Sequence, residues 1–342
     1  MAITIKDVAK EAGVSTATVS KVIHNKPSIS EATRKHVYEV MKTLNYLPNA
    51  QASNLARKCS NNIIFLTLTE TNSAFHNPHM FEIMSGAQQI IHSQKYNFSF
   101  HGVPDLDFAY HEAMDIITRK TADGILVHGS ATSKALVNLF VESDFPHVLI
   151  GRPPFATPAC WIDINNRVSG QVATNYLGEC GYTKIAFIGG PETDAISNLR
   201  LQGFLSTMQI NGLSVPNNLI KHGTYSKAGG FCMMEEILNS NCIPDAVICE
   251  SNQIALGVSC AIEKHGLSVP EDIGLITFDN YPLSQLIEPA LTVVDIDVWE
   301  MGQQAATILI QKIKKPALQI QSYTTLPRLI IRSSTINHRK NK

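Results

Sequence analysis

The first 45 residues carry apolar side chains at helical spacing, in three short groups. Thr4 followed by Asp7 is typical of a helix N-cap, and Ser15 can cap a second helix. Ser28 with Glu31 has the spacing of a capping box for a third. The pattern therefore predicts three short helices, whose buried faces carry Val8, Ala9 and Ala12, then Val19 and Val22, then Val37, Val40, Met41 and Leu44.

The spacing from Ala9 through Gly13 to Val19 is typical of a helix-turn-helix, with a small residue at the helix crossing, a permissive turn residue and a buried anchor. The outward face of the second helix holds small or polar side chains and no acid. These are Ser15, Thr16, Ala17, Thr18, Ser20 and Lys21. Such a face can enter the major groove of DNA and contact base edges and phosphates. A structural bundle with a solvated face is the alternative interpretation.

From Asn62 onward, short apolar runs alternate with stretches of helical periodicity, which predicts doubly wound α/β architecture with parallel sheets. The pattern restarts near Trp161, so two lobes are expected. We predict a head over 1–48, a linker over 49–60 and a body over 61–342, with lobes of about 61–160 plus 291–320 and 161–290 plus 321–336. The predicted strands are Ile63–Thr69, Tyr96–His101, Gly124–His128, His147–Ile150, Lys184–Ile188, Ala246–Cys249 and Ile273–Phe278.

Ligands of open α/β sheets bind outside the carboxyl ends of the strands. Those ends carry His76, Asn77, His79, Met80, His101, His128, Arg152, Asp194 to Arg200, Tyr225, Asn252, Gln253, Asp279 and Asn280. Fixed donors and acceptors beside an aromatic face suit a neutral polyhydroxylated ligand, and the residues expected to line such a cleft are Asn165, Arg200, Tyr225, Asn252 and Asp279. A single His or Tyr at a strand end is more often an ordinary surface residue. No GxGxxG follows the first strand, which argues against a dinucleotide.

Charge is distributed unevenly although the net formal charge is −1. Residues 1–60 hold nine Lys and Arg against four Asp and Glu, which leaves 19 against 25 in the remainder. A basic head on an acidic body indicates a polyanion as the partner of the head alone. A solvated basic helix face would give the same count.

Composition and cysteine content further limit the class of protein. With 44% hydrophobic and 17% charged residues, the chain is typical of a folded globular protein. Seven cysteines occur without a CxxC pair or a histidine at zinc-ligand spacing, so we expect reduced thiols, no metal and no cofactor. The N-terminus lacks a signal-peptide pattern and no apolar run approaches about 18 residues, so we expect a cytoplasmic protein without membrane contact.

The run TIKDVAKEAGVSTATVSKVI at 4–23, followed by NYLPN at 45–49, resembles the head of the lactose-repressor (LacI/GalR) family. The resemblance implies that Thr16 and Ala17 face the bases, while Lys21 stands where relatives usually carry the bidentate Arg. It also implies that 49–58 is a hinge helix whose Leu55 wedges into the minor groove, with Ser53 where relatives commonly have Arg. Further expected DNA contacts are Thr4, His24, Asn49 and Ala52. A plain linker is the alternative for 49–58.

The resemblance extends over the body, through 184–190, 200–204, 269–273, 278–280 and 291–294. It implies a two-lobed fold like that of type I periplasmic binding proteins, with Arg200 and Asp279 on the effector and His79 and Met80 at the pocket mouth; Arg152 is a further candidate contact. Amides at Asn165 and Gln253 replace carboxylates usual in the family, which favours a less acidic pocket and a neutral rather than a cationic effector. The segment 74–78 resembles regulators of maltose and α-glucoside operons.

These observations predict a sequence-specific transcription regulator, a repressor of a carbohydrate-utilisation operon. It is expected to act as a homodimer on double-stranded operator DNA, with a sugar or phosphosugar as effector. A solute-binding transport component is the second hypothesis, and the basic head argues against it. An enzyme is the third, and the chain has no G-x-S-x-G elbow, paired-His metal motif or phosphate loop.

Overall fold

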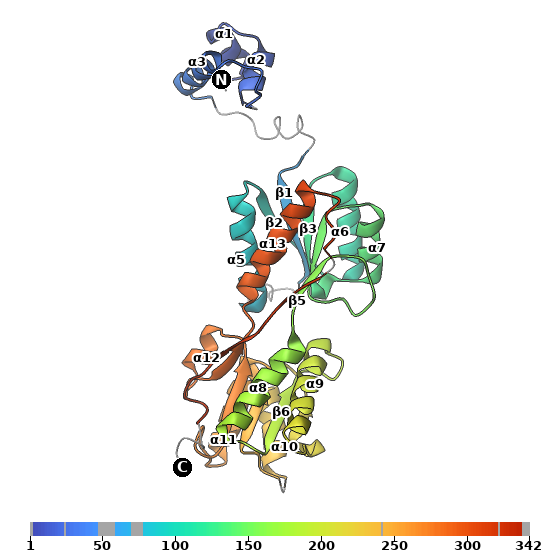
Figure 1. The fold of residues 1–342 in the computed structure, drawn as a ribbon, viewed down its shortest axis with the longest axis vertical. Helices are drawn as coiled ribbons and strands as arrows, with labels where there is room; N and C mark the ends of the chain where they lie inside the picture. Colours follow the sequence, from blue (N-terminus) through green and yellow to red (C-terminus); the bar gives the residue numbers. More distant parts are fainter. Residues whose placement is uncertain are drawn as a thin grey trace. The chain divides into compact units, whose positions relative to one another are not determined.

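The computed structural model describes residues 3–23, 25–46, 59–69, 78–240, 242–320 and 322–336. The chain divides into two compact units, one formed by residues 1–61 with 120–122 and one by 62–119 with 123–342 (Figure 1). We describe the first unit as the head and the second as the body. No helix in the described ranges combines the length and the apolar character needed to cross a membrane.

The head contains α1 (Ile5–Glu11), α2 (Thr16–Ile23) and α3 (Glu31–Thr43). The Asp7 carboxylate accepts hydrogen bonds from the backbone N–H and the hydroxyl of Thr4, at 2.8 and 2.7 Å, and so closes the start of α1. Gly13 makes the turn with φ +64°, a left-handed conformation that glycine adopts at little cost. The predicted apolar positions then meet in one core, which includes Val8, Ala9, Ala12, Val19, Val22, Val37 and Met41.

The start of α3 differs from the prediction, because Ser30 and not Ser28 caps this helix. The Ser30 hydroxyl accepts from the Thr33 backbone N–H at 3.2 Å and lies 2.8 Å from the Thr33 hydroxyl. The N–H of Arg34 donates to the Ser30 carbonyl at 3.0 Å, as the first turn of a helix beginning at Glu31 requires. Glu31 is therefore the first helical residue, too early to complete a capping box with Ser28.

The first sheet of the body has the order β11-β5-β4-β3-β1-β2 and is parallel throughout. Helices α5 and α13 cover one face and α6 and α7 the other (Figure 1). The strands are β1 (Asn62–Leu68), β2 (Asn97–Val103), β3 (Gly124–His128), β4 (His147–Ile150), β5 (Trp161–Ile164) and β11 (Ser322–Thr325). The helices are α5 (Pro78–Ser93), α6 (Leu106–Arg119), the short 3-10 turn η1 (Gly129–Ala131), α7 (Lys134–Glu142) and α13 (Val298–Lys314).

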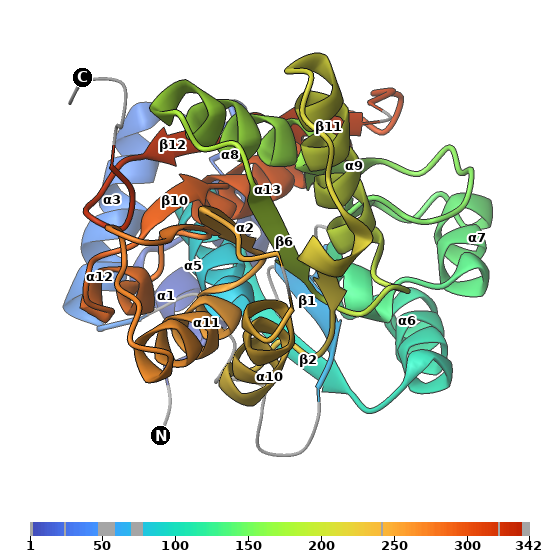
Figure 2. The same cartoon turned by 90° about the horizontal axis from the view of Figure 1, so that it is seen from below.

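The second sheet has the order β12-β10-β9-β8-β6-β7, in which only β12 is antiparallel to its neighbour. The strands are β6 (Ile185–Gly189), β7 (Ile220–His222), β8 (Ala246–Cys249), β9 (Gly274–Phe278), β10 (Thr292–Asp295) and β12 (Arg328–Ile330). The helices are α8 (Asn166–Cys180), α9 (Ala195–Ile210), η2 (Asn217–Leu219), α10 (Lys227–Leu238), α11 (Asn252–Lys264) and α12 (Pro282–Leu286). Figure 2 shows the body from below, with α8 and α10 on opposite sides of β6.

The predicted lobe boundaries are wrong at three strands. Strand β5 extends the first sheet, where Leu149 pairs with Trp161, so the chain leaves this lobe after Ile164 and not before Trp161. Strand β10 belongs to the second sheet, and β11 returns to the first. The reason is pairing: β11 adds to the exposed edge of β5 by main-chain hydrogen bonding, which apolar periodicity does not reveal. The predicted strand set also omitted β5, β7, β10, β11 and β12.

Glycines let α8 and α9 approach closely. A Cβ added at Gly170 would lie 2.1 Å from the carbonyl oxygen of Arg200, and one at Gly203 would lie 2.1 Å from that of Arg167. Both distances are far inside van der Waals contact, so only glycine fits. This contact determines where α9 carries Arg200.

We expect Gly170→Ala to lower the free energy of unfolding of the body by about 2–3 kcal/mol, because the methyl group forces two helix backbones apart. Gly178→Ala is the matched control in the same helix, since its Cβ would meet only the Asn211 side-chain amide, at 3.3 Å. The control is expected to stay within about 1 kcal/mol of wild type or to gain stability. Urea unfolding followed by circular dichroism measures both, and equal effects of the two variants would contradict this account.

Candidate ligand site and nucleic-acid interface

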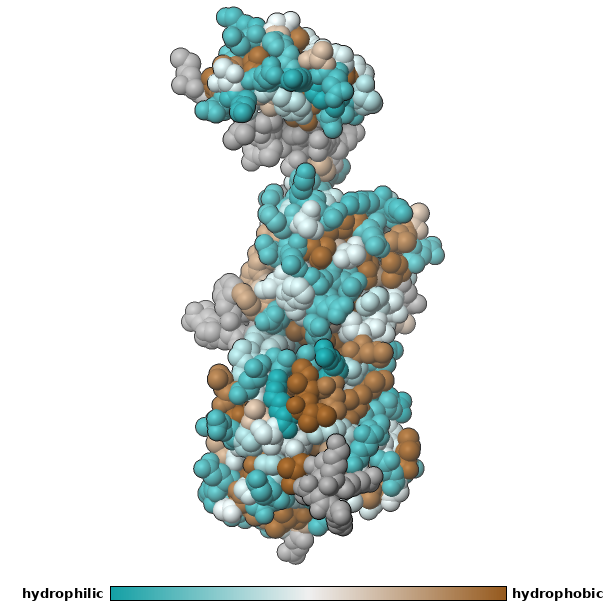
Figure 3. Space-filling view, turned by 60° about the vertical axis from the view of Figure 1, so that its left-hand side comes forward, coloured by the Kyte–Doolittle hydropathy of each residue, from teal (hydrophilic) through white to brown (hydrophobic). Residues whose placement is uncertain are grey.

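The outward face of α2 is available to a partner. Ser15, Thr16, Ala17 and Lys21 are exposed and Thr18 and Ser20 are half-buried, while Val19 and Val22 are buried. The Ser15 hydroxyl accepts from the Thr18 backbone N–H at 3.1 Å and lies 2.9 Å from the Thr18 hydroxyl, so both also stabilise the helix start. On the side drawn in Figure 3, hydrophilic side chains cover much of the head.

The segment after α2 is tied to α3. Arg34 donates to the Asn25 side-chain oxygen and to the Lys26 carbonyl oxygen, the latter at 3.1 Å, and the Tyr38 hydroxyl donates to the Val22 carbonyl oxygen at 3.3 Å. These contacts anchor the C-terminal end of α2 to α3 and so fix the backbone around Lys21 and Lys26. The other predicted DNA contacts are Thr4, which is held by Asp7, and His24, Asn49, Ala52 and Leu55, which lie outside the described residues.

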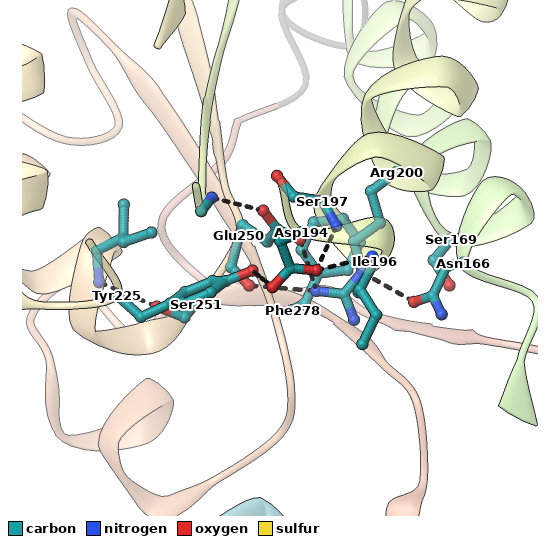
Figure 4. A network of polar contacts seen from close by, with 12 residues as sticks. Asn166, Ser169, Asp194, Ile196, Ser197, Arg200, Tyr225, Glu250, Ser251 and Phe278 are labelled. Atoms are coloured by element: carbon teal, nitrogen blue, oxygen red, sulfur yellow. Dashed lines mark hydrogen bonds and ion pairs between the residues drawn. The ribbon is translucent and has the colours of Figure 1, made fainter. Parts of the chain in front are cut away.

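Arg200 is the centre of the polar site in the second lobe. Its side chain is 6% exposed, and its Nε donates to the Asn166 carboxamide oxygen at 3.1 Å (Figure 4). One terminal nitrogen donates to the Glu250 carbonyl oxygen at 3.3 Å and lies 3.7 Å from the Glu250 carboxylate. The guanidinium carbon lies 4.2 Å from the centre of the Phe278 ring, a cation–π contact. Arg200 is therefore held by four contacts, from Asn166, Glu250 and Phe278.

Asp279 and Asn252 meet beside it. Asp279 follows β9 with φ +70°, and its carbonyl oxygen accepts from the Asn252 side-chain N–H at 3.1 Å. The Oδ1 atoms of Asp279 and of Asn252 are both buried and lack a hydrogen-bond partner among the described residues. Burial raises the pKa of Asp279 to about 6, against the opposing attraction of Arg200. Asp279 also borders a cavity of about 180 Å³, whose lining includes Glu82, Asn280, Tyr281, Asp295 and Trp299.

Tyr225 supplies an aromatic surface next to this cluster. Its hydroxyl donates to the Asp194 carboxylate at 2.9 Å, and Asp194 accepts from the Ile196 and Ser197 backbone N–H groups at the start of α9 (Figure 4). The ring lies against Gly190, where an added Cβ would come within 2.2 Å of it. Burial, with the nearby Glu250 and Asp194 carboxylates, raises the pKa of Tyr225, which keeps the phenol neutral.

Two histidines face the site from the first lobe. His79 shares a hydrogen bond with the hydroxyl of Tyr281, at 3.1 Å, and so joins α5 to the second lobe. Burial lowers the pKa of His79 to about 4, and Arg200 contributes to the shift. Burial and His79 likewise lower the pKa of His128 to about 4. Both rings are uncharged at neutral pH.

Three predicted contacts have other structural roles. Met80 is 5% exposed and packs in the core of the first lobe, where its sulfur lies 3.6 Å from the Thr67 hydroxyl, and its place at a pocket mouth stays a prediction. The Asn165 side-chain oxygen caps α8 by accepting from the Val168 N–H at 3.2 Å. Arg152 is exposed, with its guanidinium carbon 5.6 Å from the centre of the Trp161 ring. Ligand contact by Asn165 and Arg152 stays a prediction.

The predicted site did not include Asn166, Glu250 or Tyr281. Glu250 comes directly after the buried strand β8 and is itself 1% exposed. A carboxylate immediately after an apolar run was the available signal, because strand ends meet at one edge of a parallel sheet. Its partner Arg200 lies 50 residues earlier, and spacing alone does not connect the two.

The raised pKa of Asp279 makes stability depend on pH. The stabilising contribution of its protonated form is fully present below pH 3.8 and is lost as pH rises through about 6. We expect the free energy of unfolding of Asp279→Asn to be about 2–3 kcal/mol higher than that of wild type at pH 7.5. At pH 4 the two proteins should be nearly equally stable. Asp115→Asn, at an exposed surface ion pair, should shift either value by less than about 0.5 kcal/mol. Urea unfolding at both pH values measures these free energies. If the difference between Asp279→Asn and wild type is the same at the two pH values, the raised pKa of Asp279 is refuted.

Comparison with known proteins places this architecture in a family. Residues 4–49 match the model of the bacterial regulatory proteins of the lacI family, and residues 174–335 match that of a periplasmic binding protein-like domain. The HTH-type transcriptional repressor PurR of Histophilus somni (strain 129Pt) is 32% identical over 333 residues, covering 97% of this chain and 98% of that protein. The ribose operon repressor of Escherichia coli (strain K12) is 31% identical over 332 residues, covering 97% and 99%.

A solved structure of the lac repressor dimer bound to operator and the anti-inducer ONPF shares the fold, with a TM-score of 0.83 at 23% identity over 98% of this chain and 100% of that one. These relatives do not bear out the resemblance of 74–78 to maltose and α-glucoside regulators, and residues 74–77 lie outside the described ranges. The similarity to the two repressors is near full length and exceeds 30% identity. The chain belongs to the lacI family of bacterial regulatory proteins and is a DNA-binding transcriptional repressor, not an enzyme.

Proposed function

We propose that this repressor controls a carbohydrate-utilisation operon and that a sugar or phosphosugar bound beside Arg200 lowers its affinity for operator DNA. The observation that carries the proposal is the buried polar cluster of Arg200, Asn252 and Asp279 at the carboxyl ends of the strands. Ligands of open α/β sheets bind at this edge. The similarity to a ribose operon repressor supports a carbohydrate operon.

The chemistry of the cluster suits hydroxyl groups. The Arg200 guanidinium has N–H groups to donate, and the unpartnered Oδ1 atoms of Asn252 and Asp279 can accept. The ring of Tyr225, 42% exposed, offers an apolar surface for the C–H face of a pyranose or furanose. A sugar would therefore satisfy acceptors that the described protein groups leave without donors.

Contact between the lobes gives a route from ligand to DNA. His79 and Tyr281 join the two lobes through one hydrogen bond, close enough to Arg200 for its charge to act on His79. A sugar bound to both sides stabilises one relative arrangement of the lobes, and this difference in affinity is what shifts the equilibrium. Effector and operator then weaken each other's binding reciprocally, typically by about 1–3 kcal/mol.

The head acts in pairs in this proposal. Two copies of α2 in a homodimer read inverted half-sites, since a two-fold dimer matches a palindromic operator. The lac repressor structure, a dimer on operator, supports this arrangement. Hinge residues Asn49, Ala52 and Leu55 are proposed to contact the minor groove between the half-sites.

Loss of the effector response is the direct test of the site. With DNA from upstream of the protein's own gene, fluorescence anisotropy over a panel of sugars should identify one that releases wild-type protein. Asp279→Ala and Arg200→Ala should raise the sugar concentration needed by at least about tenfold while operator affinity without sugar is retained, because each removes a buried ligand contact.

Arg167→Ala is the control for the arginine change, because Arg167 is exposed on α8. Circular dichroism must show that Arg200→Ala folds, since it leaves the buried Glu250 without its partner. An unchanged sugar response in both folded site variants would refute the site.

Lys21 is expected to contact phosphate or guanine from the exposed face of α2. Lys21→Ala should weaken operator binding by about 1–3 kcal/mol and reduce the slope of log affinity against log salt by about one. Lys35→Ala on α3 is the comparison, because it removes the same exposed charge from another helix of the head. Anisotropy titrations at several salt concentrations measure the operator affinity and the salt slope of both variants. Equal losses of affinity in Lys21→Ala and Lys35→Ala would contradict a specific DNA contact by α2.

A further inference from the structure

Glu250 is a buried carboxylate placed against Arg200, the buried cation of the proposed ligand site. Its side chain is fully shielded from solvent, and its Oε1 lies 3.7 Å from a terminal nitrogen of Arg200. A buried arginine at the carboxyl edge of a sheet would by itself favour phosphate or carboxylate groups, which it binds through parallel hydrogen bonds. Glu250 already compensates that charge from within the protein.

The position of Glu250 is fixed by the chain around it. Its Oε2 accepts from the Gly190 backbone N–H at 2.8 Å (Figure 4), and a Cβ added at Gly189 would lie 3.0 Å from the same oxygen. The carboxylate is therefore held against glycine backbone by the Gly190 N–H, on the side of the guanidinium.

Further carboxylates surround the same cation. Arg200 is close enough to Asp163 and Asp279 to lower the pKa of each, although burial outweighs it and leaves both pKa values raised. Asp194 accepts from Tyr225 at the edge of the cluster. One guanidinium thus faces several carboxylates, and an anionic ligand would meet repulsion in a desolvated site, where such repulsion is strong.

The unpartnered atoms point to the same ligand chemistry. The Oε1 of Glu250 and the Oδ1 atoms of Asn252 and Asp279 are buried acceptors without hydrogen-bond partners among the described residues. Buried acceptors need donors, and leaving them unpaired is costly. Sugar hydroxyls donate, whereas a phosphate dianion only accepts.

We infer that Glu250 determines specificity in this site by excluding phosphorylated and other anionic sugars, so that the effector is an uncharged sugar. The inference rests on the proposed function, because it concerns the same site. It narrows the expected effector from a sugar or phosphosugar to an unphosphorylated sugar. It also assigns the discrimination between the two to Glu250. Glu250→Gln keeps the size and an oxygen for the Gly190 N–H while removing the charge.

Isothermal titration calorimetry on the full chain tests the inference with glucose, glucose 6-phosphate, ribose, ribose 5-phosphate and inorganic phosphate. Wild-type protein should bind each phosphosugar at least about tenfold more weakly than its parent sugar when the parent binds, and should show no binding of inorganic phosphate. Glu250→Gln should bind inorganic phosphate and the phosphosugars at least about tenfold more tightly than wild type does. Glu236→Gln, which removes a surface carboxylate paired with Lys221 at 2.6 Å, should match wild type.

Each outcome decides between the proposals. Tight binding of a phosphosugar to wild type, or unchanged phosphate affinity in folded Glu250→Gln, would overturn the role of Glu250 and leave a sugar-responsive repressor standing. If no sugar or phosphosugar in a wider panel binds the protein or releases it from DNA, the proposed function fails, and the phosphate titrations of wild type and Glu250→Gln still decide what Glu250 does. If Glu250→Gln does not fold, the wild-type comparison of phosphate and phosphosugars with parent sugars decides the inference alone.

Discussion

The polar cluster of the second lobe is organised around one buried cation, the guanidinium of Arg200. A charge removed from water is costly unless its hydrogen bonds and its electrostatic balance are supplied internally. Asn166, the Glu250 backbone and carboxylate, and the Phe278 ring supply them. The constraint reaches into the packing, because α9 places the arginine correctly only where Gly170 allows α8 to touch it. The position of Arg200 thus depends on the packing of α8 against α9.

The two lobes contribute different chemistry to the space between the sheets. The second lobe carries Arg200 with Glu250 and Asp279, whereas the first contributes Asp163 and two histidines whose pKa values are lowered by burial and which are neutral at physiological pH. The hydrogen bond between His79 and Tyr281 connects the two sides. A ligand with many hydroxyl groups can engage both sides, which is the property a two-lobed sensor needs in order to convert binding into a change of lobe arrangement.

Much of the head could be predicted from sequence, because its structure is set within a few residues. The capping of α1 by Thr4 and Asp7 and the turn at Gly13 appeared where spacing placed them. The one error, Ser28 in place of Ser30, arose between two candidate caps two residues apart and was decided by the Thr33 partner. In the body, seven strands were recognised by their apolar runs. The short strands β5 and β10 were missed although they are largely buried, and the edge strands β7, β11 and β12 were missed because they are polar or half-buried.

Local spacing and contiguous motifs were enough to predict the helix-turn-helix head, the two-lobed α/β class and the likeness to lactose-repressor relatives. The sequence also identified Arg200 and Asp279 as candidates. Three further features became visible only in the folded chain: β11 pairs with β5, Met80 packs in a core, and Glu250 forms an ion pair with Arg200. Those outcomes join residues tens to more than a hundred positions apart, and they follow from which edges and charges meet when the chain closes, which no local pattern encodes.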